Sequence, residues 1–273
     1  MKGTIVYKMT GSGNDFVVLD GRATDAAAWP PARVAQLCHR RTGVGADGLV
    51  VLTPEGPGAV RMVYWNSDGS RAAMCGNAAL CSARLAVYLE LAAPGELCLL
   101  TDAGPVRARA AAEGDRAEIG LADFDIPGRA DLGLAPGERW MAFATVGVPH
   151  LVLAVEDIEA IDLLGRGRAL RHDRRLGAAG ANVNFVAAPA EAGGPWRIRT
   201  YERGVEGETL ACGTGTVASG VALAAHGEAV PPVRFISRGG EEMTVQAGID
   251  RGAASGVWLG GQGKLVFRAV WEG

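Results

Sequence analysis

Two cysteines in this chain occupy positions where a thiol can carry out acid–base chemistry. Cys75 is followed by Gly76-Asn77 and Cys212 by Gly213-Thr214, and each motif opens an alanine-rich apolar segment. A thiol at a helix start lies at the positive end of the helix dipole, beside backbone N–H groups that lack partners within the helix. This environment lowers the pKa of a cysteine and binds carboxylates. Each segment therefore predicts a reactive thiol next to an anion-binding site.

The two segments together suit the inversion of a carbon centre. If both helix starts converge on one carboxylate, one thiolate can remove the α-proton while the other thiol delivers a proton to the opposite face. A group whose pKa lies near the working pH can serve as acid and as base, and the converging dipoles stabilise the transient carbanion. This reaction needs no metal ion and no pyridoxal cofactor. We therefore expect neither, and we expect a small carboxylate-bearing substrate.

The remaining three cysteines lack this pattern. Cys38, Cys81 and Cys98 have no following glycine, and cysteines outside disulfides are mostly buried small hydrophobic residues. Five cysteines with no C-x-x-C pair predict neither a disulfide framework nor a zinc knuckle in a chain of this length. The expected location is a reducing cytoplasm.

Helices and short strands must position the two thiols. Residues 77–93 and 214–226 are apolar around most of the helix circumference, which is typical of a helix buried on all sides. Two further helices are expected at Pro31–Arg41 and Ile158–Leu170. Short β-rich runs bounded by Gly, Pro or Asp predict strands. These runs are Thr4–Met9, Phe16–Asp20, Leu49–Leu52, Arg61–Trp65, Val106–Ala110, Met141–Val146, Leu151–Val155, Asn184–Ala187, Arg197–Tyr201, Val233–Ser237 and Leu265–Val270.

The pattern around each cysteine occurs twice, about half a chain length apart, which indicates an internal duplication. In each half a strand ends in an aromatic residue, a polar turn follows, and a Cys-Gly pair opens the buried helix. The 273 residues also suit two domains at about 150 residues each. We expect an α/β (α+β) fold with two pseudo-symmetric halves, residues 1–127 and 128–273. Each half would be a sheet that encloses a buried central helix.

Composition excludes several classes of protein. Hydrophobic residues make up 48% and charged residues 21% of the chain, an ordinary balance for a globular protein. The net charge is −3 and no dense Lys/Arg block occurs, so nucleic acid is not an expected partner. No signal peptide or membrane span is expected. The sequence leaves a homodimer open.

Six segments, in order along nearly the whole chain, resemble the diaminopimelate epimerase family. Residues 10–17 (TGSGNDFV) resemble its N-terminal signature, and residues 43–48 (GVGADG) resemble a second loop of the family. Each segment alone is weak evidence, whereas six in the correct order are specific. The other four are residues 66–77, 147–150, 182–185 and 201–215.

The resemblance implies that each half is a curled mixed or antiparallel sheet around the central helix, with the active site in the cleft between the halves. It implies a cofactor-independent isomerase that interconverts LL- and meso-2,6-diaminopimelate in lysine and peptidoglycan precursor biosynthesis. It implies that Cys75 and Cys212 are the acid/base pair and that His150 and Glu202 lie at the reacting centre. An arginine with amides suits a second carboxylate, and a glutamate suits an ammonium group. The implied substrate-binding residues are Asn14, Asn66, Gly76, Asn77, Asn182, Glu202, Arg203, Gly213 and Thr214.

Several positions depart from the family pattern. Ala78 and Leu80 replace a glycine and an arginine of the common motif, and residues 203–208 contain one extra residue. Some members have Gln in place of Gly48 and Asn in place of Val148. The missing polar groups would face the distal half of the substrate. A related two-cysteine racemase or epimerase that acts on another amino acid is therefore the alternative.

Other interpretations also stand against this one. Residues 11–13 and 213–215 suggest phosphate loops, but neither completes a nucleotide-binding motif. A binding protein without catalysis would not need both Cys75 and Cys212. His150, Asn14, Asn66 and Asn182 could instead satisfy backbone groups in turns. Glu202-Arg203 could be a solvated charge pair.

Overall fold

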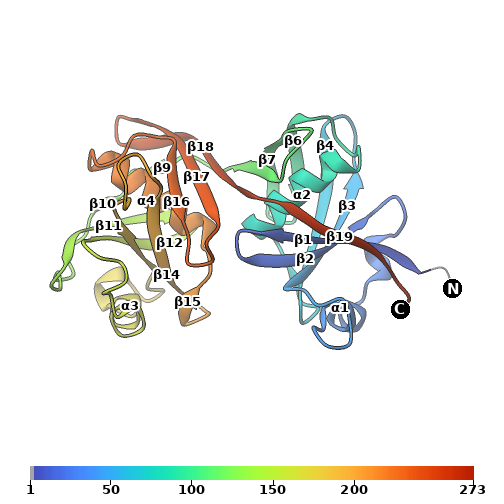
Figure 1. Cartoon of the computed structure of the whole chain (residues 1–273), viewed down its shortest axis with the longest axis horizontal. Coiled ribbons are helices and arrows are strands. Elements are labelled where there is room, and N and C mark those ends of the chain that lie inside the picture. The colour runs from blue at the N-terminus through green and yellow to red at the C-terminus, as the bar shows by residue number, and fades with distance from the viewer. Residues whose placement is uncertain (1–2) are drawn as a thin grey trace. The chain divides into compact units, whose positions relative to one another are not determined.

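The structure, a computed structural model that describes residues 3–273, places the chain in two units (Figure 1). The first unit contains the chain up to Gly120 together with Gly260–Gly273, and the second contains Leu121–Leu259. The sequence predicted a division at residue 127, seven residues beyond Gly120. It also assigned the C-terminal segment to the second half. That segment belongs to the first unit, because β19 (Lys264–Trp271) pairs antiparallel with β1 (Thr4–Gly11).

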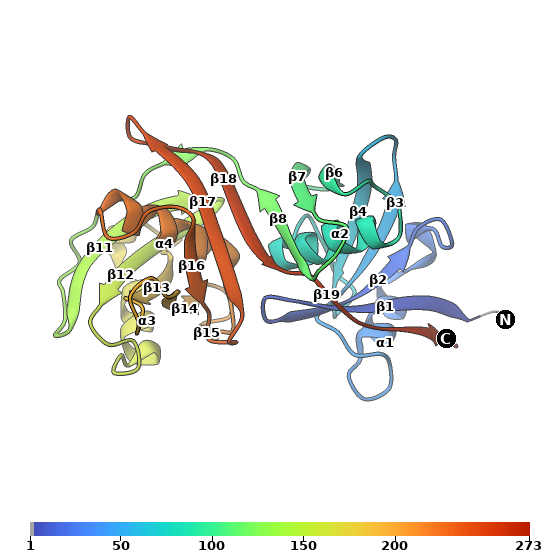
Figure 2. The same cartoon turned by 45° about the horizontal axis from the view of Figure 1, so that its top comes forward.

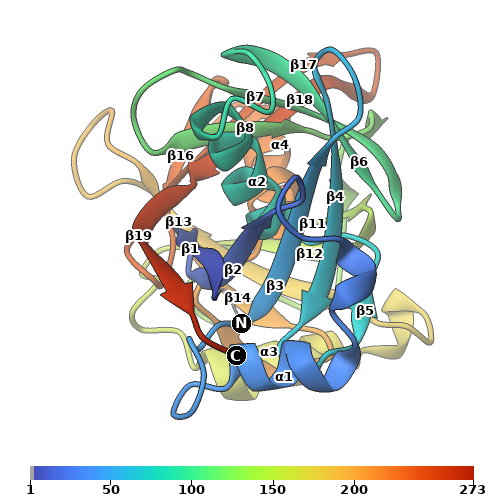
Figure 3. The ribbon, with the colours of Figure 1, turned by 90° about the vertical axis from the view of Figure 1, so that its right-hand side faces the viewer.

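The first unit is a curled sheet with a helix inside it. Its strands follow the order β19-β1-β2-β3-β4-β6-β7-β8, with parallel pairs β2–β3 and β4–β6. Helix α2 contacts every one of these strands, and Figure 3 shows it enclosed by them, with α1 outside the sheet. Besides β1 and β19, the elements are β2 (Asn14–Asp20), α1 (Pro31–Cys38), β3 (Gly48–Pro54), β4 (Ala59–Asn66), β5 (Arg71–Ala72), α2 (Gly76–Tyr88), β6 (Gly95–Thr101), β7 (Gly104–Ala110) and β8 (Arg116–Gly120).

The second unit has the same plan. Its strands follow the order β10-β11-β12-β13-β14-β16-β17, with parallel pairs β12–β13 and β14–β16. Helix α4 contacts β11, β12, β13, β16 and β17 (Figure 2). The elements are β9 (Phe124–Asp125), β10 (Gly128–Arg129), β11 (Glu138–Val146), β12 (Val148–Val155), α3 (Leu163–Arg171), β13 (Asn182–Ala187), β14 (Trp196–Glu202), β15 (Gly207–Thr209), α4 (Gly213–Ala225), β16 (Val233–Ile236), β17 (Glu242–Asp250) and β18 (Ala253–Gln262), whose last three residues belong to the first unit.

The two units therefore repeat one order of elements. Strands β1 to β7 correspond to β11 to β17, α1 corresponds to α3, and α2 corresponds to α4, with the same parallel pairs in each unit. This confirms the predicted α/β class and the duplicated architecture. The short 3-10 turns do not correspond, because Ala26–Ala28 precedes α1 whereas Arg174–Leu176 follows α3.

Packing on both faces of each sheet explains why the central strands are continuously apolar. Every residue of β13 is buried, as expected for a parallel strand that is covered by helices on both sides. In the first unit Val34 and Leu37 of α1 pack against Val17 and Leu49 in one apolar cluster. On the inner side, α2 has buried residues from Asn77 through Val87. Its alanines keep the helix narrow enough for the sheet to curl around it.

Candidate active site

Cys75 stands at the N-cap of α2, as the sequence predicts. Its backbone is extended (φ −139°, ψ 125°), its thiol makes no capping hydrogen bond, and the side chain is half-buried. The first helical bond runs from the Ala79 N–H to the Cys75 carbonyl at 2.9 Å. The N–H groups of Gly76, Asn77 and Ala78 therefore have no partner within the helix. A half-buried thiol and three helix-start N–H groups lie together in the first unit.

Asn14 and Asn77 are brought together by a direct hydrogen bond. The Asn77 amide nitrogen donates to Asn14 Oδ1 at 2.8 Å, and the Asn14 amide nitrogen donates to Asp47 Oδ2 at 2.9 Å. Asn77 is buried and belongs to the first turn of α2. Asn14 and Asn77, both predicted to bind substrate, are thus hydrogen-bonded to each other at the start of α2.

An ionic cluster supports this asparagine pair through Asp47, which accepts the hydrogen bond from Asn14. Arg40 Nη2 lies 2.7 Å from both Asp47 Oδ1 and Asp15 Oδ1. Burial raises the pKa of Asp15, but the hydrogen bonds from Arg40 and Lys8 outweigh burial and lower the pKa to about 2. Asp15 therefore stays ionised at neutral pH and keeps Arg40 in place.

Asn66 has a hydrogen-bond partner, Tyr64, that the sequence did not indicate. The Tyr64 hydroxyl donates to Asn66 Oδ1 at 3.1 Å, and the Asn66 amide nitrogen donates to Ser70 Oγ at 3.0 Å. Burial raises the pKa of Tyr64, and the negative charge of Cys75 and a hydrogen bond to its side chain add to the rise. A Cβ at Gly48 would lie 2.6 Å from Tyr64 Cε2. Gly48, one of the departures from the family pattern, thus leaves room for this buried tyrosine.

Cys212 occupies the equivalent N-cap of α4 in the second unit. Its backbone is again extended (φ −131°, ψ 106°), and the first helical bond runs from the Thr216 N–H to the Cys212 carbonyl at 2.9 Å. The Cys212 Sγ lies 3.8 Å from Thr214 Oγ1. The second unit therefore repeats the half-buried thiol at a helix start.

The protonation of Cys212 differs from the sequence expectation. Burial raises the pKa of this thiol to about 11, and the negative charge of Glu202 adds to the rise. Hydrogen bonds from the Gly215 N–H and from Thr214 act in the opposite direction but do not prevail. Burial also raises the pKa of Glu202. Cys212 is therefore a thiol at neutral pH, and the negative charge of Glu202 favours that protonated form.

Replacing Glu202 tests this electrostatic link. Glu202→Gln removes a negative charge near Cys212, so the thiolate becomes easier to form and the pKa of Cys212 falls. We expect the pH of half-maximal Cys212 alkylation by iodoacetamide, followed by mass spectrometry, to drop by about 1 pH unit. Glu208→Gln is the matched control, because Glu208 is paired with Arg199 at 2.7 Å. An unchanged or higher midpoint in Glu202→Gln would disprove the link.

Three predicted site residues form a row across the ends of neighbouring strands in the second unit. His150 on β12 pairs with Asn182 on β13. The register of Val183 with Tyr201 places Glu202 at the same end of β14. Strand register therefore brings together residues that are far apart in the sequence.

His150 and Asn182 are both buried, and each has a defined partner. His150 Nδ1 lies 3.3 Å from the amide nitrogen of Asn184. Burial lowers the pKa of His150 to about 3, and the positive charge of Arg203 contributes to the fall, so the imidazole is neutral. Asn182 Oδ1 accepts the backbone N–H of Arg203 at 2.7 Å. Asn182 thus fixes the turn that carries Arg203.

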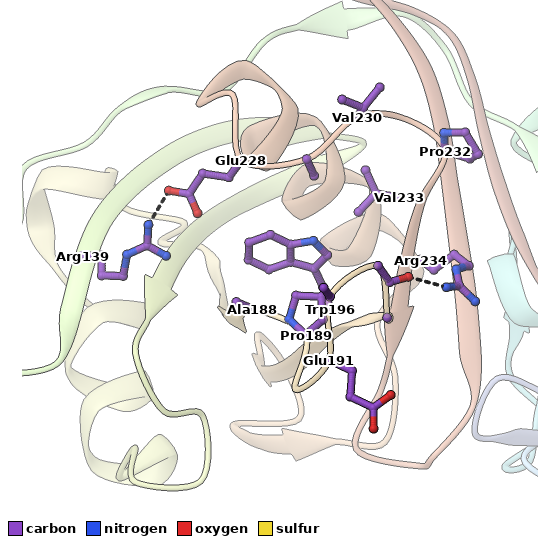
Figure 4. Close-up of a pocket in the computed structure, with 14 residues that line it drawn as sticks. Arg139, Ala188, Pro189, Glu191, Trp196, Glu228, Val230, Pro232, Val233 and Arg234 are labelled. Atoms are coloured by element: carbon purple, nitrogen blue, oxygen red, sulfur yellow. Dashed lines mark hydrogen bonds and ion pairs between the residues drawn. The ribbon is translucent and has the colours of Figure 1, made fainter.

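A hollow elsewhere in the second unit contains none of the predicted site residues. It has a volume of about 550 Å³ and lies around Trp196 (Figure 4). Three of its charged side chains have partners: Arg139 lies 2.7 Å from Glu228, and Arg234 donates to the Gly193 carbonyl at 2.8 Å. Within residues 3–273 no cluster of three or more His, Cys, Asp or Glu could hold a metal ion. No helix in that range is long and apolar enough to cross a membrane.

Solved structures share this fold. A phenazine biosynthesis protein of the PhzF family from Bacillus anthracis matches over 99% of both chains, with a TM-score of 0.71 and 11% sequence identity. A predicted epimerase from Pseudomonas aeruginosa matches over 98% of both chains, with a TM-score of 0.66 and 20% identity. The chain therefore shares the fold of these proteins, and at such identities the likeness concerns the fold alone.

Sequence comparison defines the family within this fold. The profile of the diaminopimelate epimerase family matches residues 6–124 and 142–254. The diaminopimelate epimerase of Gemmatimonas aurantiaca is 42% identical over 97% of this chain and 98% of its own length. The chain belongs to the diaminopimelate epimerase family and is an isomerase. This confirms the resemblance drawn from the six motifs.

Proposed function

We propose that the protein interconverts LL- and meso-2,6-diaminopimelate by a two-cysteine, two-base mechanism without pyridoxal phosphate. We place this reaction in the cytoplasm, in lysine and peptidoglycan precursor biosynthesis. The observation that carries the proposal is the repeated N-cap cysteine, half-buried at the start of a buried helix in both units. The relatives named diaminopimelate epimerase support the choice of substrate.

The chemistry needs one proton carrier on each face of the α-carbon. The N–H groups of Gly76-Asn77 and Gly213-Thr214 hold the α-carboxylate. One thiolate takes the α-proton, and the C–H electron pair stays on the α-carbon and its carboxylate. The other thiol gives its proton to the opposite face and becomes a thiolate. The bonds balance without an oxidant, and the two thiols exchange roles in the reverse direction.

The protonation of Cys212 assigns it a first role in this cycle. A thiol with a pKa of about 11 is a proton donor at neutral pH. Its proton leaves for the substrate carbanion. His150, a neutral imidazole, contributes hydrogen bonding at the reacting centre rather than charge.

The distal amino-acid end of the substrate requires charged partners. We assign its carboxylate to Arg203, supported by Asn66 and Asn182. Glu202, which acts on Cys212, suits an ammonium group near the reacting carbon. Asn66 and Asn182 already use one or both amide ends within their own units. Asn14 bonds to Asn77 and Asp47 and therefore positions the helix start.

Two of the departures from the family pattern are explained by packing. Ala78 and Leu80 are fully buried in α2. The Leu80 side chain lies against the backbone of Gly261, where an added Cβ would approach Leu80 Cδ1 to 2.7 Å. These residues adjust the packing of α2 in the first unit. Val148, half-buried at the start of β12, is the departure that still favours the alternative amino-acid substrate.

Proton exchange in heavy water tests reaction and substrate together. LL-diaminopimelate is incubated with the enzyme in D₂O and followed by NMR and chiral chromatography. We expect deuterium at the α-carbon and formation of the meso isomer. If diaminopimelate stays unlabelled while another amino acid exchanges its α-proton, the related-racemase alternative replaces this proposal.

Oxidation should link the two thiols if they flank one carbon. We expect mild oxidation of the substrate-free enzyme to abolish activity, a reductant to restore it, and mass spectrometry to find a Cys75–Cys212 crosslink. Because the Cys212 thiol has a raised pKa, the crosslink should form faster as the pH rises. Modification of Cys38 or Cys98 without this crosslink would contradict the facing arrangement.

A further inference from the structure

We infer that Asn184 is a positioning residue that holds His150 as the neutral tautomer with its proton on Nε2. Asn184 lies on β13, two residues after Asn182, and is completely buried. The inference rests on the proposed function only where it gives the Nε2–H group a role in catalysis.

Hydrogen-bond chemistry decides the tautomer. The Asn184 amide nitrogen donates to the Leu151 carbonyl at 3.1 Å and lies 3.3 Å from His150 Nδ1. An amide nitrogen carries two protons and offers no acceptor. His150 Nδ1 must therefore accept, and in a neutral imidazole the proton then resides on Nε2.

The orientation of the Asn184 amide is fixed by the Leu151 carbonyl. A carbonyl can only accept, so it requires the NH₂ end of the amide. At the other end Asn184 Oδ1 accepts the Thr200 hydroxyl at 3.0 Å, which agrees with this orientation. Rotation of the amide by half a turn would set its oxygen against the Leu151 carbonyl. The buried cluster therefore permits one arrangement.

The same amide contacts the start of the catalytic helix α4. A Cβ at Gly215 would lie 2.1 Å from Asn184 Oδ1, so glycine is required there for close approach. Asn184 thus connects His150, on β12, with the turn that follows Cys212. This contact places the tautomer-determining side chain against the first turn of the helix.

The consequence is a hydrogen-bond donor ready for a ligand. His150 Nε2 is buried and has no hydrogen-bond partner among residues 3–273. A buried N–H group without a partner costs free energy, and an oxygen or thiolate acceptor would relieve that cost. Burial and Arg203 lower the pKa of His150 to about 3, which agrees with a neutral donor. His150 therefore donates through Nε2 to the substrate carboxylate or to a thiolate and does not act as a base through that atom.

Nitrogen NMR measures the tautomer without any substrate. The chain has four histidines, so ¹⁵N-histidine labelling gives few signals, and loss of one set in His150→Gln assigns His150. We expect a protonated Nε2 and an unprotonated Nδ1 at neutral pH. A proton on Nδ1 would overturn the inference. The expected tautomer without deuterium exchange into diaminopimelate would leave the inference standing and remove the proposed function.

Asn184→Asp then tests the positioning role. A carboxylate accepts hydrogen bonds only, so it should draw the proton to Nδ1 and leave Nε2 without one. We expect the NMR pattern to reverse and kcat to fall by about 100-fold, with a smaller change in KM. Thr200→Val is the matched control, because it removes the bond at the other end of the amide and should keep the Nε2–H tautomer. Reversal of the tautomer with unchanged kcat would overturn the role of the donor. If Asn184→Asp does not fold, the NMR spectrum of the wild-type protein still tests whether the His150 proton resides on Nε2.

Discussion

Cys75→Ala and Cys212→Ala are each expected to lower kcat by at least about 10²- to 10⁴-fold. Either change leaves one face of the α-carbon without a proton carrier, so inversion cannot be completed. The loss should be seen in both directions, from the LL and from the meso isomer, by chiral chromatography. Serine replacements are a softer test, since a hydroxyl can take over weakly.

Cys98→Ala is the matched control for these variants. Cys98 is half-buried on β6 and belongs to neither helix start. Cys81→Ala should also keep most activity, because the Cys81 thiol is fully buried within α2. Near-normal turnover of Cys212→Ala would refute the two-base mechanism, whichever substrate is used.

The two central helices could be predicted from the sequence because they are apolar around most of their circumference. Their N-terminal limits differ from the prediction by one residue, since the glycine after each cysteine is already helical. Helix α2 ends at Tyr88 instead of continuing to Ala93. Glu90 takes a positive φ of 56°, and the Leu91 N–H bonds back to the Ala86 carbonyl at 2.8 Å. This backbone arrangement ends a helix without the glycine that would have revealed it.

The strands that were not predicted, and the division of the chain between the two units, depend on contacts between segments that are distant in the sequence. The predicted runs do not include β5, β6, β8, β9, β10, β15, β17 and β18, and these strands carry glycines or charged residues that weaken a local pattern. No local signal shows that β19 pairs with β1, because the two strands lie at opposite ends of the chain. Only the folded sheet assigns the C-terminal segment to the first unit.

The candidate site, like the fold, could be predicted from the sequence only in part. The family resemblance indicated His150, Asn182 and Glu202, and strand register places these three residues in one row. Tyr64 and Asn184 read as ordinary strand residues, so their hydrogen bonds could not be foreseen. The pKa of Cys212 is a similar case. A helix start predicts a lowered value, but burial and Glu202, both results of tertiary packing, raise it to about 11.

Arg203→Ala is expected to lower kcat/KM for diaminopimelate by about 10²- to 10³-fold, since loss of one partner of a desolvated ion pair costs several kcal/mol. Asn182 holds the backbone of Arg203 at 2.7 Å. Among residues 3–273 no ion pair with the Arg203 guanidinium is found, which leaves it available for a carboxylate. Steady-state kinetics with LL-diaminopimelate measures the loss.

The control for Arg203→Ala is Arg174→Ala, which removes the same charge from an exposed position of the second unit. It should leave kcat/KM almost unchanged, so that a loss in Arg203→Ala reports a specific contact rather than net charge. Arg203→Lys should recover only part of the loss, because lysine lacks the planar fork that binds a carboxylate through two hydrogen bonds. Alanine, which has no distal carboxylate, should be a poor substrate for the wild-type enzyme. If Arg203→Ala left diaminopimelate turnover intact, the distal end would have another partner, and the half-buried Val148 position would become the first place to look for a different substrate.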